Sequence, residues 1–197
     1  MKKLAALVVV LLAWTVSASA KEYQSSFGFT LAAPDNWLVL TKQEIANNPE
    51  LAGPPGVSAG RIDPQLKAVE SGSNEFLYDR TTSDATFSDN INVRLGGKGE
   101  VPGTPEAVKA QCTAYGQALN RVAGRTLAIA KCEDRDMGAS KAFYVEYEGR
   151  VAGTVAMQYQ FVRRDGRLVF VTATCKTTSL DKFRPEFEAI VRSIRLN

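Results

Sequence analysis

Three carboxylates close together are the first candidates for chemistry in this sequence. Glu133, Asp134 and Asp136 lie in the segment KCEDRDMG, and carboxylate oxygens of this kind are ligands for calcium. Their spacing is not that of an EF-hand loop, and Lys131 and Arg135 interleave with the acids. We therefore expect a solvated hairpin loop at this position and assign no metal ligand.

A glycine-rich segment, GGKGEVPG at residues 96–103, invites comparison with a phosphate-binding loop. Such a loop has the pattern Gly-x-x-x-x-Gly-Lys-Ser/Thr, which this segment lacks. We expect a flexible loop that leads into a helix, and we expect no cofactor.

Basic residues offer a candidate surface for an anionic partner. The residues concerned are Arg61, Arg163, Arg164 and Arg167. The last three surround a single turn, where charged side chains also protect a sheet edge from pairing with another chain. We favour the protective role, with the basic patch as the alternative.

Aromatic and acidic residues offer two weaker candidates. Trp37, Tyr144 and Tyr147 could line a ligand groove together with phenylalanines, but aromatic residues more often form the core. Glu186 and Glu188 lie in the last expected helix, and we interpret them as ordinary surface residues.

Histidine is absent from the sequence. Ser–His and Cys–His catalysis and the common zinc sites all need an imidazole, so these classes are excluded. We expect no enzymatic activity and assign no catalytic residue. The alternative within catalysis is a hydrolase that works with carboxylates, Ser, Tyr or Lys.

Residues 1–20, MKKLAALVVVLLAWTVSASA, have the order of a secretory signal peptide. Two lysines precede an apolar stretch of about 13 residues, which is shorter than the ~20 that span a bilayer. The small residues Ala18, Ser19 and Ala20 form a cleavage site. The sequence thus predicts export to the periplasm or beyond, a mature domain over residues 21–197, and no stable membrane insertion.

The net charge excludes a further class of function. The chain has 24 Lys and Arg against 21 Asp and Glu, so loss of the two signal-peptide lysines leaves a net charge of about +1. A general nucleic-acid binder usually has a clear basic excess, and we expect no nucleic-acid partner.

Apolar periodicity and turn residues predict a series of strands and helices. GFTLAAPDNWLVL at residues 28–40 is typical of a tight hairpin, and Thr41 and Glu44 fit a capping box at the start of a short helix. Further strands are expected near 75–80, 90–95, 126–132, 141–148, 153–163 and 167–175, and helices near 63–72, 104–120 and 181–192.

The apolar pattern of the last two expected strands predicts how helices and sheet are layered. If Asp165 and Gly166 form a two-residue turn, Phe161 lies opposite Phe170 and both sheet faces are substantially apolar. Helices must then cover both faces. We expect an α+β fold in which an antiparallel sheet lies between helices.

The three cysteines leave room for one disulfide and one free thiol. If the long helix packs antiparallel on the strand that follows it, Cys112 lies at the same height along the strand as Cys132. Their Cα atoms can then come within the ~7 Å that a disulfide needs. We favour this pair, with Cys175 as a buried thiol. The alternative is Cys112 with Cys175, if the helix covers the last strand instead.

Several segments resemble the PsbP-like fold family, which includes secreted bacterial proteins of the DcrB type. GFTLAAPDNW is similar to the family's Gly-Phe-x-x-x-x-Pro-x-x-Trp opening, and NINV is similar to a strand before a long helix. DGRLVFVTATC and FRPEFEAIVRSIRL are similar to the closing strand and helix. The resemblance implies a sheet between helices, a Trp37 that packs at the first turn, and no shared catalytic site.

Two functions remain after these exclusions. The first is a non-catalytic envelope protein that binds another envelope protein or assists an assembly. The second is a small-ligand-binding protein or a hydrolase that works without histidine. The missing histidine and the lack of a compact motif favour the first.

Overall fold

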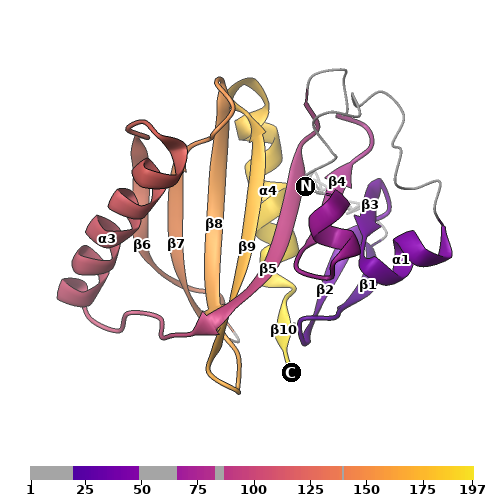
Figure 1. Cartoon of the computed structure of the whole chain (residues 1–197), viewed down its shortest axis with the longest axis horizontal. Helices are drawn as coiled ribbons and strands as arrows, with labels where there is room; N and C mark the ends of the chain where they lie inside the picture. The colour runs from indigo at the N-terminus through magenta and orange to yellow at the C-terminus, as the bar shows by residue number, and fades with distance from the viewer. Residues whose placement is uncertain (1–19, 49–65, 83–86, 139) are drawn as a thin grey trace, which may run out of the picture.

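A computed structural model describes residues 20–48, 66–82, 87–138 and 140–197 of the chain (Figure 1). The expected signal peptide, apart from Ala20, lies outside the described residues, and so does Arg61.

In chain order, these residues form β1 (Ala20–Ser25), β2 (Phe29–Pro34), β3 (Trp37–Leu40), α1 (Lys42–Asn47), β4 (Glu75–Asp79), β5 (Asn90–Lys98), α3 (Pro105–Ala123), β6 (Ile129–Asp136), β7 (Lys141–Glu148), β8 (Thr154–Val162), β9 (Arg167–Lys176), the 3-10 turn η2 (Thr177–Ser179), α4 (Leu180–Arg192) and β10 (Arg195–Leu196). Residues 66–70 are also helical.

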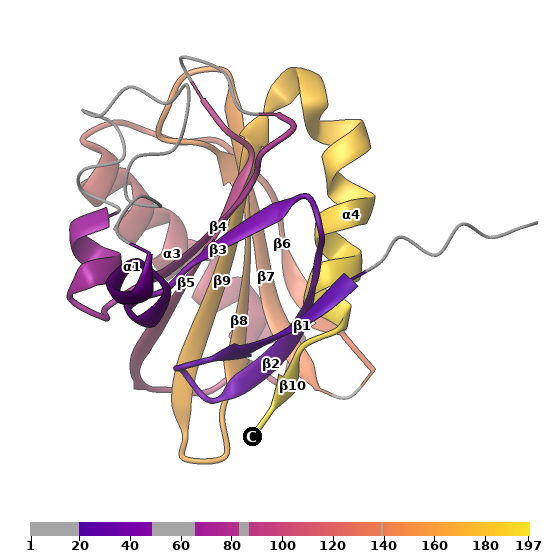
Figure 2. The same cartoon turned by 90° about the vertical axis from the view of Figure 1, so that its right-hand side faces the viewer.

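Two antiparallel sheets organise these elements. The larger sheet has seven strands in the order β3-β4-β5-β9-β8-β7-β6, and the smaller has three in the order β1-β2-β10. Helices α1 and α3 lie on one face of the large sheet, and α4 lies on the other (Figure 2). The protein is therefore an α+β fold with helices on both faces of an antiparallel sheet, as the sequence predicted.

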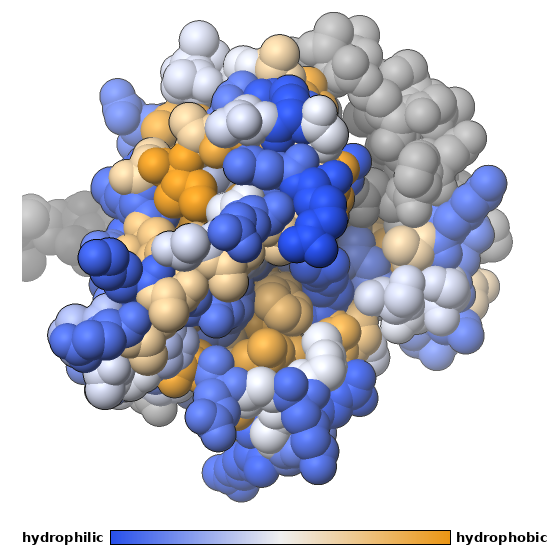
Figure 3. Space-filling model, turned by 60° about the vertical axis from the view of Figure 1, so that its left-hand side comes forward, coloured by the Kyte–Doolittle hydropathy of each residue, from blue (hydrophilic) through white to orange (hydrophobic). Residues whose placement is uncertain are grey.

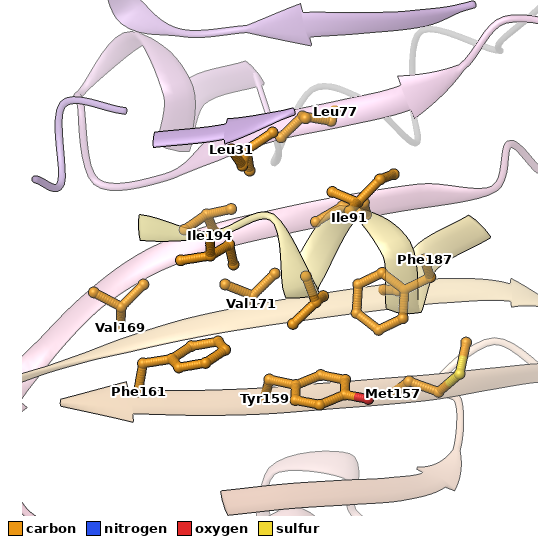
Figure 4. Close-up of a cluster of buried hydrophobic side chains, with 14 of the residues drawn as sticks. Leu31, Leu77, Ile91, Met157, Tyr159, Phe161, Val169, Val171, Phe187 and Ile194 are labelled. Carbon is orange, nitrogen blue, oxygen red and sulfur yellow. The ribbon is translucent and has the colours of Figure 1, made fainter. Parts of the chain in front are cut away.

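The main core lies between α4 and the large sheet. Phe183, Phe187, Ile190 and Val191 are buried on α4, and their spacing forms one stripe of the helix. Figure 4 shows Phe187 beside Tyr159, and their ring centroids are 5.6 Å apart. Side chains of the small sheet, including Leu31, complete this core.

Helix α3 is attached to the opposite face in a different way. It begins after Thr104, whose hydroxyl accepts a hydrogen bond from the Ala107 amide. None of its side chains is fully buried, and it contacts the sheet through a half-buried stripe that includes Tyr115 and Leu119. This helix therefore contributes much less core than α4.

The pairing of β8 with β9 differs from the prediction by one residue. Phe161 lies opposite Val169, because Arg164, Asp165 and Gly166 form the loop and Gly166 takes a positive φ of 78°. A shift of one residue moves every side chain to the other face of a strand. In the observed register Val171 lies opposite Tyr159, and both side chains pack in the core under α4.

The corrected register gives the α3 face a polar centre. Gln158 donates a hydrogen bond to the Thr172 hydroxyl at 2.8 Å and accepts one from the Tyr115 hydroxyl at 2.7 Å. Gln160 donates to Gln158 at 3.1 Å. The α3 face also carries an apolar cluster that includes Phe143, Val145 and Tyr147, so both faces are substantially apolar, as the sequence predicted.

The opening segment is not the tight hairpin that its sequence suggests. Strand β2 pairs with β1 and β10 in the small sheet, whereas β3 pairs with β4 at the edge of the large one. The turn at Asp35 and Asn36 thus carries the chain from one sheet to the other. Trp37 is buried directly after it, where its ring lies 5.7 Å from that of Phe183.

Candidate functional site

The three acids of KCEDRDMG lie on a strand rather than in a loop. Strand β6 continues through Asp136 because this segment pairs with β7. Glu133 accepts a hydrogen bond from Arg135 at 2.8 Å, and Asp136 accepts one from the Gly138 amide at 2.7 Å. Asp134 is half-buried, and burial raises its pKa. No three acidic or cysteine side chains among the described residues are placed to hold a metal ion.

A charged network lies between α4 and the sheet. The guanidinium of Arg184 donates two hydrogen bonds to Glu146, at 2.7 and 2.8 Å. The hydroxyl of Tyr144 donates to the same carboxylate at 2.7 Å. Glu146 is only 5% exposed, yet the Arg184 hydrogen bonds lower its pKa to about 2. This carboxylate therefore stays ionised at any ordinary pH.

Arg135 completes the network from β6. Its guanidinium lies 3.4 Å from the centroid of the Tyr144 ring and donates to the Tyr159 hydroxyl at 2.6 Å. It also donates to Glu188 of α4 at 3.2 Å. Each charge in this network faces a partner inside the protein, so the network holds α4 on the sheet.

Two acids of α4 are therefore not the ordinary surface residues that the sequence suggested. Glu188 takes part in the network, and Glu186 accepts a hydrogen bond from the Trp37 indole at 2.7 Å. Local patterns do not indicate these contacts, because the partners are more than 50 residues apart along the chain. One signal was available: Glu146 interrupts an otherwise apolar and aromatic strand, AFYVEY.

The aromatic residues Tyr144, Tyr147 and Trp37 are all buried in the core, which is the interpretation that the sequence favoured. A ligand groove lined by them is not found among the described residues.

A hollow of about 130 Å³ lies where β4, β5 and the start of α4 meet. Asp79 and Asp89 are buried in its lining, and Lys176, Lys182 and Glu186 contribute further charges. Asp89 accepts hydrogen bonds from the Lys176 amide and the Ser179 hydroxyl. Burial raises the pKa of Asp89. The lining therefore combines three carboxylates with two lysines.

One disulfide joins α3 to the edge strand of the large sheet. Cys112 of α3 is bonded to Cys132 of β6, with the two Cα atoms 5.9 Å apart. This is the pair that the helix-on-strand argument favoured over Cys112 with Cys175. Cys175 is free and buried, and burial raises its pKa to about 12.

The arginines around the β8–β9 turn have different surroundings. Arg163 points toward the small sheet, where it donates to the Phe27 carbonyl at 2.6 Å and forms an ion pair with Asp165. Arg164 and Arg167 are exposed. A further cation, Lys98 of β5, lies directly opposite Arg167 in the sheet.

Lys98 was missed because it belongs to the glycine-rich segment that the sequence assigned to a loop. Strand β5 continues through Gly96 and Gly97 to Lys98, with a register shift after Leu95. The alternating apolar pattern stops at Leu95, so only the pairing with β9 reveals the last residues of this strand.

These cations lie at one end of the molecule. The β8–β9 turn projects beyond the rest of the large sheet (Figure 1). The lowest part of Figure 3, which stands at the height of this turn in Figure 1, is mostly hydrophilic. Lys98, Arg164 and Arg167, which we call the cationic end, are exposed at the surface.

Comparison with known proteins identifies the fold. No protein-family model matches the chain, and no curated protein matches it in sequence. Among solved structures, it is similar to cyanobacterial PsbP (CyanoP) from Synechocystis sp. PCC 6803, with a TM-score of 0.56, 16% identity, and 91% of this chain and 94% of that chain covered. It is also similar to the Ran-binding protein Mog1p of Saccharomyces cerevisiae, with a TM-score of 0.50, 11% identity, and coverage of 91% and 96%.

Identities this low establish the fold and nothing finer. The chain has a PsbP-like fold, as the resemblance of its short motifs implied.

Proposed function

We propose that this protein is a non-catalytic binding module of the bacterial envelope, related to the DcrB-like secreted proteins. In this proposal the signal peptide at residues 1–20 directs it to the periplasm or outside the cell. Its role there is to bind another envelope protein or to assist an assembly.

The observation that carries the proposal is that the buried charges between α4 and the sheet are paired with one another and not with a substrate site. Glu146, the carboxylate with the most strongly lowered pKa, is held by Arg184 and Tyr144. A general acid or base needs a pKa near the working pH and access to a substrate. Glu146 has neither, whereas Lys98, Arg164 and Arg167 are exposed at the surface.

Two further observations support the proposal, the first on binding and the second on location. One protein of the same fold, Mog1p, is named as a Ran-binding protein, so the fold is compatible with binding another protein. The disulfide between Cys112 and Cys132 is compatible with an oxidising compartment.

Among the helices that the structure describes, none has the length and apolar character of a membrane span.

Cross-linking in the cell envelope tests this function. Cells that express the tagged protein are treated with a cross-linker, and adducts are identified by mass spectrometry. We expect one reproducible adduct with an envelope protein, absent when the tag is on an unrelated exported protein. Recovery of the uncross-linked protein alone, or of the same adducts with the control, would contradict the proposal.

The hollow at Asp79 and Asp89 favours a second candidate function, the binding of a small zwitterionic molecule. Thermal melting of the purified protein in the presence of amino acids and betaines tests it, because a ligand that binds the folded state raises the melting temperature. A shift that disappears in Asp89→Asn supports this candidate. Unchanged melting across the panel at millimolar concentrations rejects it.

A further inference from the structure

We propose that the cationic end, formed by Lys98, Arg164 and Arg167, is the docking site for an acidic segment of the protein partner. The inference rests on the proposed function and names the surface and the chemistry of the partner. Its basis is an arrangement of like charges that form no ion pair with a carboxylate of the described chain.

The strand register creates the first part of this arrangement. Lys98 on β5 lies directly opposite Arg167 on β9. Like charges directly opposite each other in an antiparallel pair are unfavourable. Arg164 adds a third cation three residues away, on the same turn.

Backbone contacts hold these residues in place. The Gly99 amide donates to the Gly166 carbonyl at 3.0 Å, so the end of β5 is attached to the β8–β9 turn. The side chain of Arg167 donates to the Gly96 carbonyl at 3.1 Å. The end of β5 and the turn therefore present their cations on a common, hydrogen-bonded frame.

A bulge in β5 is part of the same arrangement. The register shifts between Leu95 and Lys98, and such irregularities re-aim the side chains that follow them. Glycine suits this point, because a Cβ at position 96 would displace the ring of Phe170 and one at position 99 would lie 2.6 Å from the Leu168 side chain. The glycines thus allow the strand to reach Lys98 across a closely packed neighbour.

The acids at this end do not neutralise the three cations. Asp165, the acid of the turn, forms its ion pair with Arg163 at 3.2 Å. Glu100 is exposed. Within the described residues, Lys98, Arg164 and Arg167 form no ion pair with any carboxylate.

An acidic protein segment suits this surface better than a membrane or a nucleic acid. Guanidinium groups match carboxylates with paired hydrogen bonds, and exposed cations steer an acidic partner toward them. A membrane-binding surface would also present apolar side chains, but the large exposed hydrophobics of the described chain are Val122 of α3 and Val151 of the β7–β8 turn. A mature net charge of about +1 offers little to a long polyanion.

Peptide binding tests the inference directly. The mature protein is titrated into a fluorescent peptide of alternating Glu and Gly, with a peptide of alternating Gln and Gly as the uncharged control. The test variant is Lys98→Glu/Arg164→Glu/Arg167→Glu. The matched control is Lys109→Glu/Arg121→Glu/Arg150→Glu, which changes the net charge equally at exposed cations elsewhere.

We expect the wild type to bind the acidic peptide and not the uncharged one, more weakly as salt rises. The test variant should bind at least tenfold more weakly, and the matched control within threefold of wild type. Equal weakening of both variants, or no binding by the wild type at millimolar protein, overturns the inference. So does a preference for phosphatidylglycerol vesicles that the test variant loses, which would reassign the surface to lipid.

Cross-linking in the envelope separates this inference from the proposed function. If the test variant forms the same adduct as the wild type in the same yield, the binding function stands and the cationic end is the wrong surface. If neither protein forms an adduct, the proposed function itself fails. Near-identical circular dichroism spectra of the two variants ensure that folding does not explain a difference.

Discussion

The two groups of cations in this protein have opposite surroundings. Arg135 and Arg184 lie between α4 and the sheet, where carboxylates, hydroxyls and tyrosine rings surround them. Lys98 and Arg167 lie opposite each other on exposed strand ends without an ion pair in the described chain. The first group stabilises the fold, whereas the second slightly opposes it.

This difference shows how function can be located without a catalytic motif. A charged residue that is paired inside the protein, such as Arg184 with Glu146, is explained by its contribution to the stability of the fold. A cluster of like charges that forms no internal ion pair does not stabilise the fold in this way, and an acidic binding partner would account for it. The two groups should therefore respond to substitution in opposite ways.

The largest effect is expected for Arg184→Ala. This change leaves Glu146 buried without its bidentate partner, and breaking such a pair costs about 3–4 kcal/mol in the free energy of unfolding. Urea denaturation measures the loss. The double variant Glu146→Leu/Arg184→Met removes both charges and should recover most of it. A loss below about 1 kcal/mol for Arg184→Ala would mean that the network does not hold α4.

Removal of the disulfide should have the next largest effect. The bond between Cys112 and Cys132 spans 20 residues, and the chain-entropy model assigns roughly 3 kcal/mol to a loop of this length. In Cys112→Ser/Cys132→Ser we expect faster amide hydrogen exchange in α3, which has no fully buried side chain, than in α4. Equal acceleration in both helices would contradict this contrast.

Acid should weaken the ion pair between Glu146 and Arg184 as the pH falls from 4.5 toward about 2. The pKa of Glu146 falls from an ordinary value of 4.5 to about 2 in the folded protein. Its contribution to stability is therefore complete above pH 4.5 and is lost as the pH falls toward 2. Denaturation between about pH 6 and pH 2 measures this loss, and Glu146→Leu/Arg184→Met should lose less over the same range. An equal loss in the two proteins would remove Glu146 as the cause.

Much of the fold could be predicted from the sequence because it depends on local patterns. The stripe of α4 and the Thr104 cap of α3 are visible as residue spacings. The β8–β9 register was wrong because a three-residue loop and a two-residue loop are both compatible with Asp165 and Gly166. That single residue decides which side chains of β8 and β9 lie on the same face of the sheet.

The candidate sites depended on contacts that no local pattern contains. Arg184 contacts Glu146 from 38 residues away, and Lys98 lies beside Arg167 only because β5 pairs with β9. The sequence identified Arg164 and Arg167 as a possible patch but placed Lys98 in a flexible loop. Long-range strand pairing, rather than composition, brings the cationic end together.

The smallest effect on stability is expected for Lys98→Glu, and its sign is the informative part. The new carboxylate would lie opposite Arg167, and an opposite-charge pair across an antiparallel sheet is worth roughly 0.5 kcal/mol. We therefore expect a small increase in the free energy of unfolding. Lys98→Gln, which removes the repulsion without adding a pair, should fall between the variant and the wild type.

If the cationic end serves a partner and not the fold, the single variant Lys98→Glu should show both effects in one sample. Its melting temperature and its affinity for the acidic peptide are measured side by side with those of the wild type. We expect the melting temperature to rise slightly while the affinity falls. A fall in both, or an unchanged affinity with a higher melting temperature, would contradict it.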